Sequence, residues 1–240
     1  MSSGPSKRYG CFYGVGVGPG DPELLTLKAQ RILKQVPIIC APRSETSQES
    51  YAFNIVRDLI DTSRQGILRV TFPTDDPDEA AEVWRNAAEE IAEQLQQGKD
   101  VAFITEGDPM LYSTFSYVLE SIRSEHPDFQ VEIVPGVSSV MAAAASAAVP
   151  LVTHGQRLAI LPAVYGIDDL RRAIASYDTI VLMKVNRTLL EALANLENLG
   201  LAGKGIYVRR ATTAHEQVVR DLHQLSEEDL DYFSLLIIRK

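Results

Sequence analysis

The sequence predicts an α/β protein with a largely parallel sheet, and two observations lead to this fold class. Short apolar runs, typical of buried strands, alternate with longer stretches of helical periodicity along most of the 240 residues. Several of these runs end in turns rich in Gly, Pro and Asp that lead into a helix, as strands of parallel sheets do. A chain of this length forms one large domain or two smaller ones.

The first strand, loop and helix lie near the N-terminus. An apolar strand is expected over residues 12–17, and its last residues begin the glycine-rich segment GVGPGD. Asp21 is expected to cap the following helix, with Pro22 at the first helical position and Glu23 in the first turn.

The same alternation continues along the chain. Further strands are expected at residues 36–42, 100–105, 131–135, 157–162, 179–183, 205–210, 217–222 and 233–240, and further helices at 50–60, 78–98, 110–122, 137–149, 167–175 and 187–199. The last strands follow one another without a long helix between them, which favours an antiparallel portion there.

A polar segment, RSEHPDFQ, marks the expected domain boundary because Pro127 interrupts any helix there. We therefore predict an N-terminal α/β domain with a largely parallel sheet over residues 1–126. A C-terminal α/β domain with a mixed sheet is predicted over residues 127–240.

Composition excludes several classes of protein. The net charge of −9 argues against binding to nucleic acid or to an acidic membrane, although a local basic pocket remains compatible with it. Cys11 and Cys40 are too few for a disulfide scaffold and do not have metal-ligand spacing. The N-terminal residues lack an apolar signal core, and no run of 18 apolar residues occurs. We expect a cytoplasmic protein with no membrane span and no bound metal.

The glycine-rich loop does not match the common phosphate-binding patterns. The dinucleotide fingerprint G-x-G-x-x-G needs a third glycine where this chain has Pro19, counting from Gly14, or Asp21, counting from Gly16. A P-loop needs a lysine directly after its glycines, and the first one here is Lys28. The Asp21 carboxylate would also disfavour an anion at the helix N-terminus.

Four loops nevertheless follow predicted strands, where open α/β sheets bind their ligands. Any one of them could be simple turn chemistry, but together they are more specific. Their segments are GVGPGD from Gly16, EGDP from Glu106, VPGVSS from Val134, and Met183 with Lys184.

In this order the loops resemble those of the tetrapyrrole methyltransferase family, which uses S-adenosylmethionine to methylate uroporphyrinogen-derived macrocycles. The resemblance runs from Tyr13 to the final LLIIRK through YGVGVGPGDPELLTLKA, FITEGDPMLYSTFSY, VEIVPGVSS and VLMKV. Within the family, EGDPMLYSTF is most similar to the branch that methylates C20 of precorrin-2 or its cobalt form, on the route to cobalamin. Sister enzymes usually have a second glycine at the place of Glu106.

The resemblance implies two α/β domains with a cofactor cleft between them and a homodimeric assembly. Residues implied to bind S-adenosylmethionine are Pro19, Glu106, Gly107, Asp108, Leu111, Tyr112, Ser138, Ser139, Met183, Ala211 and Thr212. The last two come from ATTAHEQVV, which resembles the family's G-T-x-x-x-Q pattern with Ala211 in place of glycine.

The residue types fit this cofactor, which carries a sulfonium and an ammonium group and no phosphate. Carboxylates are available from Glu106 and Asp108. Simpler explanations exist for others: Ser138 and Ser139 could start a helix, and Met183 could fill a core.

The implied substrate carries several carboxylates, which an acidic protein can hold only with a local group of cations. Arg43, Lys184, Arg187, Arg209 and Arg210 lie near predicted strand ends and are the candidates, although each could be a solvated loop charge. Gly18 and Asp21 are expected to line the substrate side of the first loop.

After methyl transfer to carbon, a proton has to leave the ring, and a nearby base would help. The sequence assigns no catalytic residue. Weak candidates are Glu106 and Tyr112, then Asp108 and His154, and the latter is more simply a loop residue.

Two other functions stay open. One is a nucleotide-binding regulatory module without catalysis, suggested by the opening glycines. The other is a sister methyltransferase that acts at another macrocycle carbon or on diphthamide.

Overall fold

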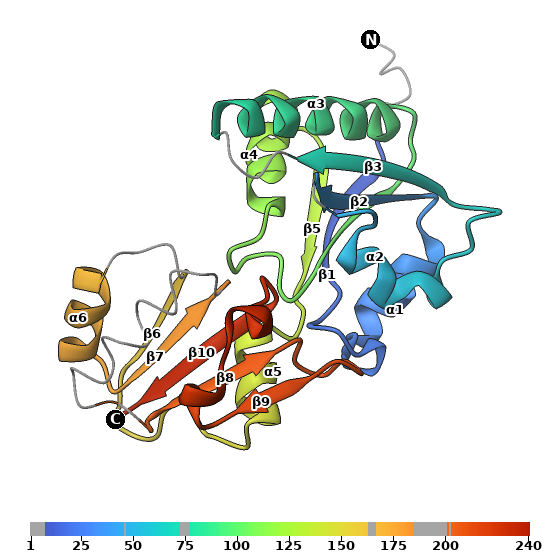
Figure 1. Ribbon diagram of the computed structural model, residues 1–240. Helices are drawn as coiled ribbons and strands as arrows, with labels where there is room; N and C mark the ends of the chain where they lie inside the picture. Colours follow the sequence, from blue (N-terminus) through green and yellow to red (C-terminus); the bar gives the residue numbers. More distant parts are fainter. Residues whose placement is uncertain (1–7, 46, 73–76, 163–166, 185–200, 202) are drawn as a thin grey trace, which may run out of the picture. The chain divides into compact units, whose positions relative to one another are not determined.

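The computed structural model describes residues 8–45, 47–72, 77–162, 167–184, 201 and 203–240 (Figure 1). The chain divides into two compact units, Met1–Ser138 and Ser139–Lys240. Each unit contains one five-stranded sheet. This arrangement matches the α/β class predicted from the alternation of strands and helices.

The first sheet is parallel throughout and has the strand order β3-β2-β4-β1-β5. Its strands are β1 (Cys11–Gly16), β2 (Ile38–Ser44), β3 (Gly66–Phe72), β4 (Val101–Thr105) and β5 (Gln130–Val134). The sequence analysis missed β3, whose segment GILRVTF pairs with β2. Only one side of β3 is paired, so it is an edge strand, and its apolar residues are only partly buried apart from Val70.

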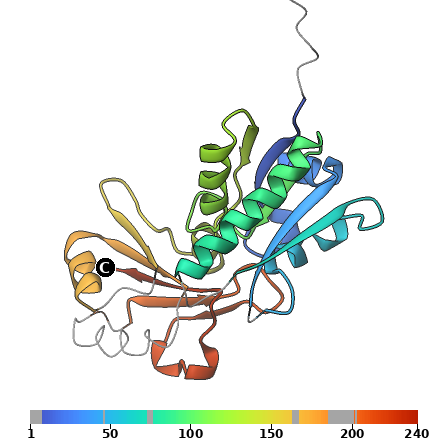
Figure 2. The same cartoon turned by 90° about the horizontal axis from the view of Figure 1, so that it is seen from above.

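Helices cover both faces of this sheet. The pair α1 (Leu27–Gln35) and α2 (Tyr51–Val56) packs on one face, and the pair α3 (Pro77–Gln96) and α4 (Phe115–Glu125) packs on the other (Figure 1, Figure 2). Along β4, Phe103 belongs to the core under α3 and α4, whereas Ile104 belongs to the core under α1 and α2. This alternation is the consequence of burying a strand on both faces.

Two helices begin several residues later than the sequence predicted. Asp21 caps only the 3-10 turn η1 (Pro22–Leu24), because Leu25 is already extended, and α1 starts after Thr26, whose hydroxyl accepts from the Ala29 N–H at 3.1 Å. Similarly, α4 begins at Phe115 rather than at residue 110. The residues in between form a loop in which Tyr112 has a φ of 50°.

The second sheet is mixed and has the order β6-β7-β10-β8-β9. Its strands are β6 (Leu158–Pro162), β7 (Thr179–Met183), β8 (Gly205–Arg209), β9 (Gln217–Val219) and β10 (Ser234–Arg239). Only β6 and β7 pair in parallel, so the antiparallel portion predicted near the C-terminus is confirmed.

The second sheet has its own core and helices. On one face Leu182, Tyr207 and Leu236 pack with Leu170 and Ala173 of α6 (Ile167–Ser176). The helix α5 (Ser139–Ser146) contacts β8 and β10. Two short 3-10 turns of this unit are η3 (Leu222–Gln224) and η4 (Glu227–Asp229), and a further one, η2 (Arg57–Leu59), belongs to the first unit. The helix expected over residues 187–199 lies outside the described residues.

The division between the units falls later in the chain than the predicted boundary after residue 126. The reason is β5, which pairs with β1 and therefore belongs to the first sheet. The polar segment around Pro127 is the loop between α4 and β5. Within the described residues, no helix is long and apolar enough to cross a membrane.

Candidate functional site

Three of the predicted ligand-binding loops meet at one edge of the first sheet. They follow β1, β4 and β5, which are neighbours in the order β4-β1-β5. Because all three strands are parallel and end in register, with Gly16 opposite Thr105 and Val15 opposite Val134, their carboxyl ends share that edge. This is the edge at which open α/β sheets bind ligands.

The loops after β1 and β4 are joined by a two-way backbone contact. The Gly107 N–H donates to the Gly18 carbonyl at 2.7 Å, and the Gly18 N–H donates to the Gly107 carbonyl at 3.3 Å. Both residues have a positive φ, 80° for Gly18 and 68° for Gly107. Residues with a side chain seldom adopt this conformation, so glycine is strongly favoured at both ends of the contact.

The loop after β5 approaches the same contact closely. A Cβ atom added to Gly136 would lie 2.1 Å from the Gly107 carbonyl oxygen, and one added to Gly16 would lie 2.6 Å from that oxygen and 2.7 Å from the Gly136 nitrogen. The three loops therefore pack backbone against backbone around Gly107.

The Asp108 carboxylate links two of these loops. One oxygen accepts from the Met110 N–H at 2.9 Å, and the other accepts from the Gly136 N–H at 3.0 Å. The sequence suggested Asp108 as a carboxylate for the cofactor or as a base. In the structure its two oxygens are used to hold the loops after β4 and β5 together, a role that its position in the sequence did not reveal.

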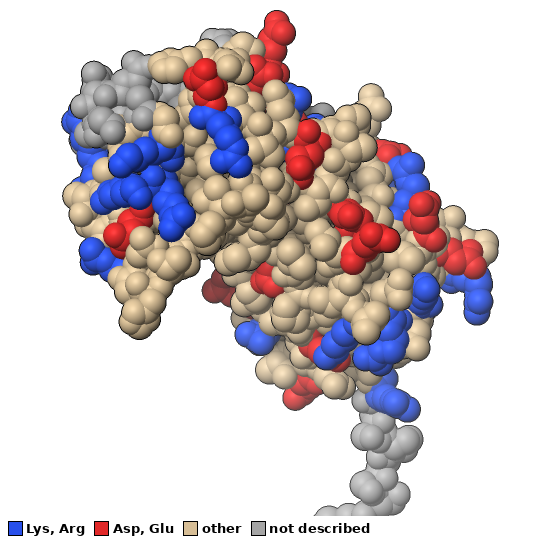
Figure 3. Space-filling model, turned by 90° about the horizontal axis from the view of Figure 1, so that it is seen from below, with Lys and Arg blue, Asp and Glu red and all other residues tan. Residues whose placement is uncertain are grey.

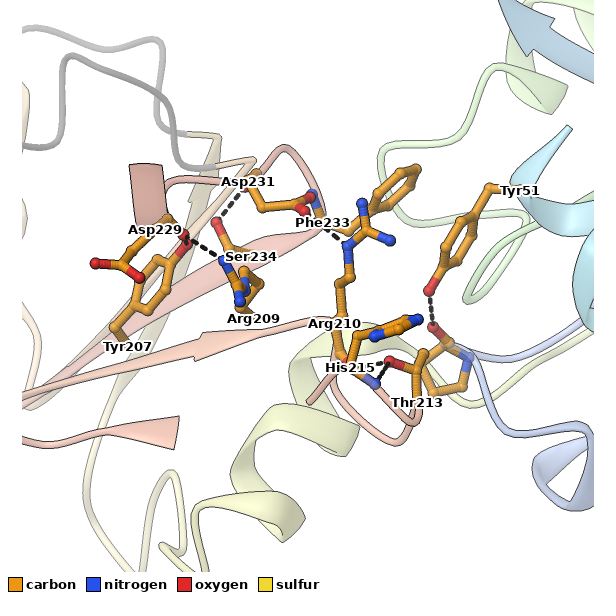
Figure 4. Close-up of polar contacts among 11 residues, drawn as sticks. Tyr51, Tyr207, Arg209, Arg210, Thr213, His215, Asp229, Asp231, Phe233 and Ser234 are labelled. Carbon is orange, nitrogen blue, oxygen red and sulfur yellow. Dashed lines mark hydrogen bonds and ion pairs between the residues drawn. The ribbon is translucent and has the colours of Figure 1, made fainter. Parts of the chain in front are cut away.

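The other first-unit candidates lie along the same loops. Pro19 is buried, and the Tyr51 hydroxyl from α2 is directed at its carbonyl oxygen at 3.5 Å (Figure 4). Glu106 is exposed, as is Tyr112, whereas Leu111 is half-buried. Asp21 accepts from the Glu23 N–H at 2.8 Å and thereby shapes the turn after Pro19.

In the second unit, the candidates gather at one end of β7, β10 and β8. Leu235 of β10 is opposite Met183, and Ser234 is opposite Arg209. The Lys184 N–H donates to the Ser234 carbonyl at 3.1 Å. Three neighbouring strands thus bring Met183, Lys184 and Arg209 to a common edge, followed by Arg210 and the buried Ala211.

The cations at this edge have different partners, and Figure 4 shows those of Arg209 and Arg210. Arg210 pairs with the Asp231 carboxylate at 2.7 Å and lies over the Phe233 ring. Arg209 donates to the Asp229 backbone carbonyl at 3.4 Å, but its buried Nε has no hydrogen-bond partner among the residues that the structure describes. The Lys184 ammonium lies 5.2 Å from the centre of the Tyr232 ring. Among the described residues, no carboxylate forms an ion pair with Lys184 or Arg209.

The nearby Asp229 carboxylate is occupied by another group. It accepts from the backbone N–H and the hydroxyl of Ser226 at 2.9 and 2.8 Å, and these hydrogen bonds lower its pKa, with a smaller contribution from the Arg209 charge. Asp229 therefore attracts Arg209 only at a distance. The guanidinium of Arg209 has donors left for a further acceptor.

Comparisons with known proteins agree with this arrangement. Residues 11–225 match the model of the Tetrapyrrole (Corrin/Porphyrin) Methylases. The chain belongs to this family. It is 40% identical to the probable cobalt-precorrin-2 C(20)-methyltransferase of Methanocaldococcus jannaschii over 95% of both chains. It is 35% identical to the cobalt-precorrin-2 C(20)-methyltransferase of Salmonella typhimurium over 96% of this chain and 97% of the relative.

A solved structure is also similar. The uroporphyrin-III C-methyl transferase of Thermus thermophilus, crystallised with S-adenyl homocysteine, superposes with a TM-score of 0.69 and 27% identity. The superposition covers 96% of this chain and 92% of the other. The resemblance to the tetrapyrrole methylases seen in the loops of the sequence is thus confirmed over nearly the whole chain.

The sixth residue counted from Ala211 is Glu216, whose carboxylate accepts from the Thr212 N–H at 2.6 Å. Sequence analysis overlooked Glu216, although counting the pattern from Ala211 would have found it.

Of the other predicted site residues, one forms hydrogen bonds within the protein, one lies outside the described residues and one lies in an exposed turn. The Arg43 guanidinium donates to the Thr71 hydroxyl at 3.0 Å and to the carbonyls of Ser47 and Gln48, so it shapes the loop after β2. Arg187 lies outside the described residues. His154 is exposed in a turn before β6.

One face of the molecule carries both basic and acidic side chains. On the face drawn in Figure 3, small groups of basic side chains are interspersed with acidic ones across a largely uncharged surface. The cations at the edge of the second sheet differ from one another in their hydrogen-bond and ion-pair partners.

The glycine contacts lead to a first prediction. Replacing Gly136 by Ala should separate the loops and destabilise the fold by about 1–3 kcal/mol, because the new methyl group meets the Gly107 carbonyl rather than a side chain that can move. Amide hydrogen exchange should show faster exchange of the Gly107 N–H.

The matched control is Gly66→Ala, whose Cβ would meet the tip of the Ile38 side chain at 2.9 Å and lie at an ordinary contact distance, 3.9 Å, from the Pro37 carbonyl oxygen. It should change stability by no more than about 0.5 kcal/mol. Equal effects of the two substitutions would show that the three loops are not packed as described.

Proposed function

We propose that this chain is an S-adenosylmethionine-dependent methyltransferase that methylates C20 of precorrin-2 or of its cobalt form in cobalamin biosynthesis. The observation that carries the proposal is the match, over at least 95% of both chains, to relatives named for this reaction at 40% and 35% identity. The segment EGDPMLYSTF, in which the chain resembles the C20 branch, directly follows β4 at the edge of the first sheet.

The residues at both sheet edges fit S-adenosylmethionine. Glycines without room for a Cβ leave backbone groups and no side chains at the ends of β1 and β5, which suits an adenosyl group bound by backbone contacts. We propose that the cofactor is bound in the first unit by Pro19, Glu106, Gly107, Leu111, Tyr112 and Ser138, and in the second by Ser139, Met183, Ala211 and Thr212. Asp108 acts by holding Gly136 and Met110 in place.

When bound, S-adenosylmethionine supplies an electrophilic methyl group. The ring carbon of a reduced tetrapyrrole is already electron-rich, so the protein has to align the two reactants rather than activate one of them. Alignment of this kind can lower a barrier by about 7 kcal/mol or more in favourable cases. The rigid glycine packing around Gly107 is suited to this task because it leaves the loops little freedom to move.

The proton displaced from C20 needs an acceptor. We propose Glu106 for this role, with Tyr112 beside it, because both are exposed on the loop after β4. Asp108 is less suited, since it is only half-exposed and links the loops after β4 and β5. Exposure of Glu106 gives the proton a route to solvent.

Carboxylates of the substrate need cations that are not already paired with a carboxylate or used to shape a loop of the protein. Arg43 and Arg210 are occupied by a loop and by Asp231, respectively. Of the candidates that the structure describes, Lys184 and Arg209 are left, and the buried Nε of Arg209 favours an anionic ligand because buried donors are normally satisfied. We propose that these two residues bind substrate carboxylates, with Gly18 and Asp21 lining the first loop.

We also propose a homodimer, as is usual in the family that the chain resembles, and a reducing, cytoplasmic setting. Cys11 and Cys40 are both buried free thiols, and burial raises the pKa of each. Light scattering of the purified protein measures the assembly directly.

The proposed reaction predicts one product. Incubation with S-adenosylmethionine carrying a ¹³C-labelled methyl group and precorrin-2, with and without cobalt, should add a single methyl group, which ¹³C NMR should place at C20. A methyl group at another carbon would indicate a sister activity. Absence of transfer to either substrate, with a folded protein, would contradict the proposal.

The cation assignment yields a further prediction. Lys184→Met and Arg209→Gln should each raise the KM for the tetrapyrrole about tenfold, the scale of one hydrogen bond to a charged group, and leave the KM for S-adenosylmethionine unchanged. Arg239→Gln, at the other end of β10, is the matched control. An unchanged tetrapyrrole KM in both variants would remove these residues from the substrate site.

A further inference from the structure

We infer that Glu216 is a positioning residue: it holds in place the backbone at Ala211 and Thr212, which we propose to contact the cofactor. The inference deepens the proposed function and rests on it, because it assumes that these two residues contact S-adenosylmethionine. Glu216 lies outside the residues assigned to the cofactor or the substrate above. Its role follows from three features of the second unit.

The first feature is the strained backbone of the turn after β8. Arg210 has a φ of 45° and Thr212 a φ of 68°, although neither is glycine. Such conformations persist only where the surroundings hold them, and they are common at functional sites. Ala211, between them, is buried. The turn therefore needs an anchor.

The second feature is the hydrogen bonding that anchors this turn. Thr213 donates its hydroxyl to the Arg210 carbonyl at 2.8 Å, and the His215 N–H donates to the Thr213 hydroxyl at 3.1 Å (Figure 4). These bonds lie within the turn and do not reach the Thr212 N–H. That group is held by the Glu216 carboxylate, at 2.6 Å.

The third feature is a link from the same carboxylate oxygen to α5. The Ser146 hydroxyl donates to Oε2 of Glu216 at 2.6 Å, across 70 positions in the sequence. Ser139, a proposed cofactor contact, is the first residue of α5. One oxygen of Glu216 thus joins the strained turn to the helix that carries another cofactor contact.

A second hydrogen bond between the segments next to β9 and α5 provides a control. Arg220, just after β9, donates to the Ala147 carbonyl at 2.5 Å. This bond fastens the same end of α5 but does not reach the turn at Thr212. If attachment of α5 were all that mattered, loss of Arg220 and loss of Glu216 would have similar effects.

An acceptor at position 216 is needed, but a negative charge is not. The amide oxygen of glutamine can accept from both the Thr212 N–H and the Ser146 hydroxyl. The inference therefore separates Glu216→Gln from Glu216→Ala, and it distinguishes positioning by hydrogen bonds from attraction between the carboxylate and a cationic cofactor.

The test compares Glu216→Ala, Glu216→Gln and Arg220→Ala in the full-length chain. Binding of S-adenosylhomocysteine, which lacks the sulfonium charge, is measured by calorimetry, together with the KM for S-adenosylmethionine and kcat. We expect Glu216→Ala to weaken binding and raise this KM about three- to tenfold with a nearly unchanged kcat, and Glu216→Gln to stay within about twofold of the native protein. Arg220→Ala should leave both binding measurements unchanged, even if its melting temperature falls.

The outcomes separate the inference from the proposed function. If the native protein binds neither ligand, the proposed function fails. If the native protein binds and Glu216→Ala binds equally well, the positioning role alone is overturned. It is also overturned if Glu216→Gln is as impaired as Glu216→Ala, or if Arg220→Ala weakens binding to the same extent.

Discussion

The first unit depends on backbone-to-backbone packing around the Gly107 carbonyl. Gly18 and Gly107 each donate a backbone hydrogen bond to the other. Gly16 and Gly136 approach the Gly107 carbonyl oxygen so closely that neither could carry a Cβ. The constraint explains why three loops from distant parts of the sequence form one surface. It also explains the role of Asp108, which satisfies amides of two of these loops. Because the loops are closely packed, their backbone groups are held in fixed positions. A methyl transfer that depends on the alignment of its two reactants requires such fixed groups.

In the part of the chain that the structure describes, the second unit holds its candidate residues in place without close glycine packing. Its candidate residues lie at the ends of β7 and β8, on either side of the start of β10, and are followed by a turn that adopts left-handed conformations without glycine. Side chains rather than small residues hold this turn. The cations divide accordingly: Arg210 is neutralised by Asp231, whereas Lys184 and Arg209 have no ion-pair partner among the described residues. The partners of these cations, and not their positions in the sequence, therefore separate the one that is ion-paired from the two that we propose as ligands of the substrate.

Much of the fold was predictable because buried strands and their turns leave strong local patterns. The alternation of strands and helices gave the α/β class, and the closely spaced last strands gave the antiparallel portion. The edge strand β3 was missed because its residues are only partly buried apart from Val70. The starts of α1 and α4 were placed too early, since Asp21 and the segment after Met110 form turns of their own. For the site, loop motifs located the candidates, but the bonds of Asp108, Arg43 and Glu216 depend on residues far away in the chain.

Hydrogen exchange of the full-length protein with and without S-adenosylmethionine tests the central claim most directly, namely that glycine loops of the first unit and the strained turn of the second bind the same cofactor. The account predicts slower exchange at residues 16–21, 106–112 and 136–139 and also at 210–213, with little change at the distant turn formed by Asp61 and Ser63. Protection confined to one of the two units, under conditions where calorimetry shows the cofactor bound, would contradict it.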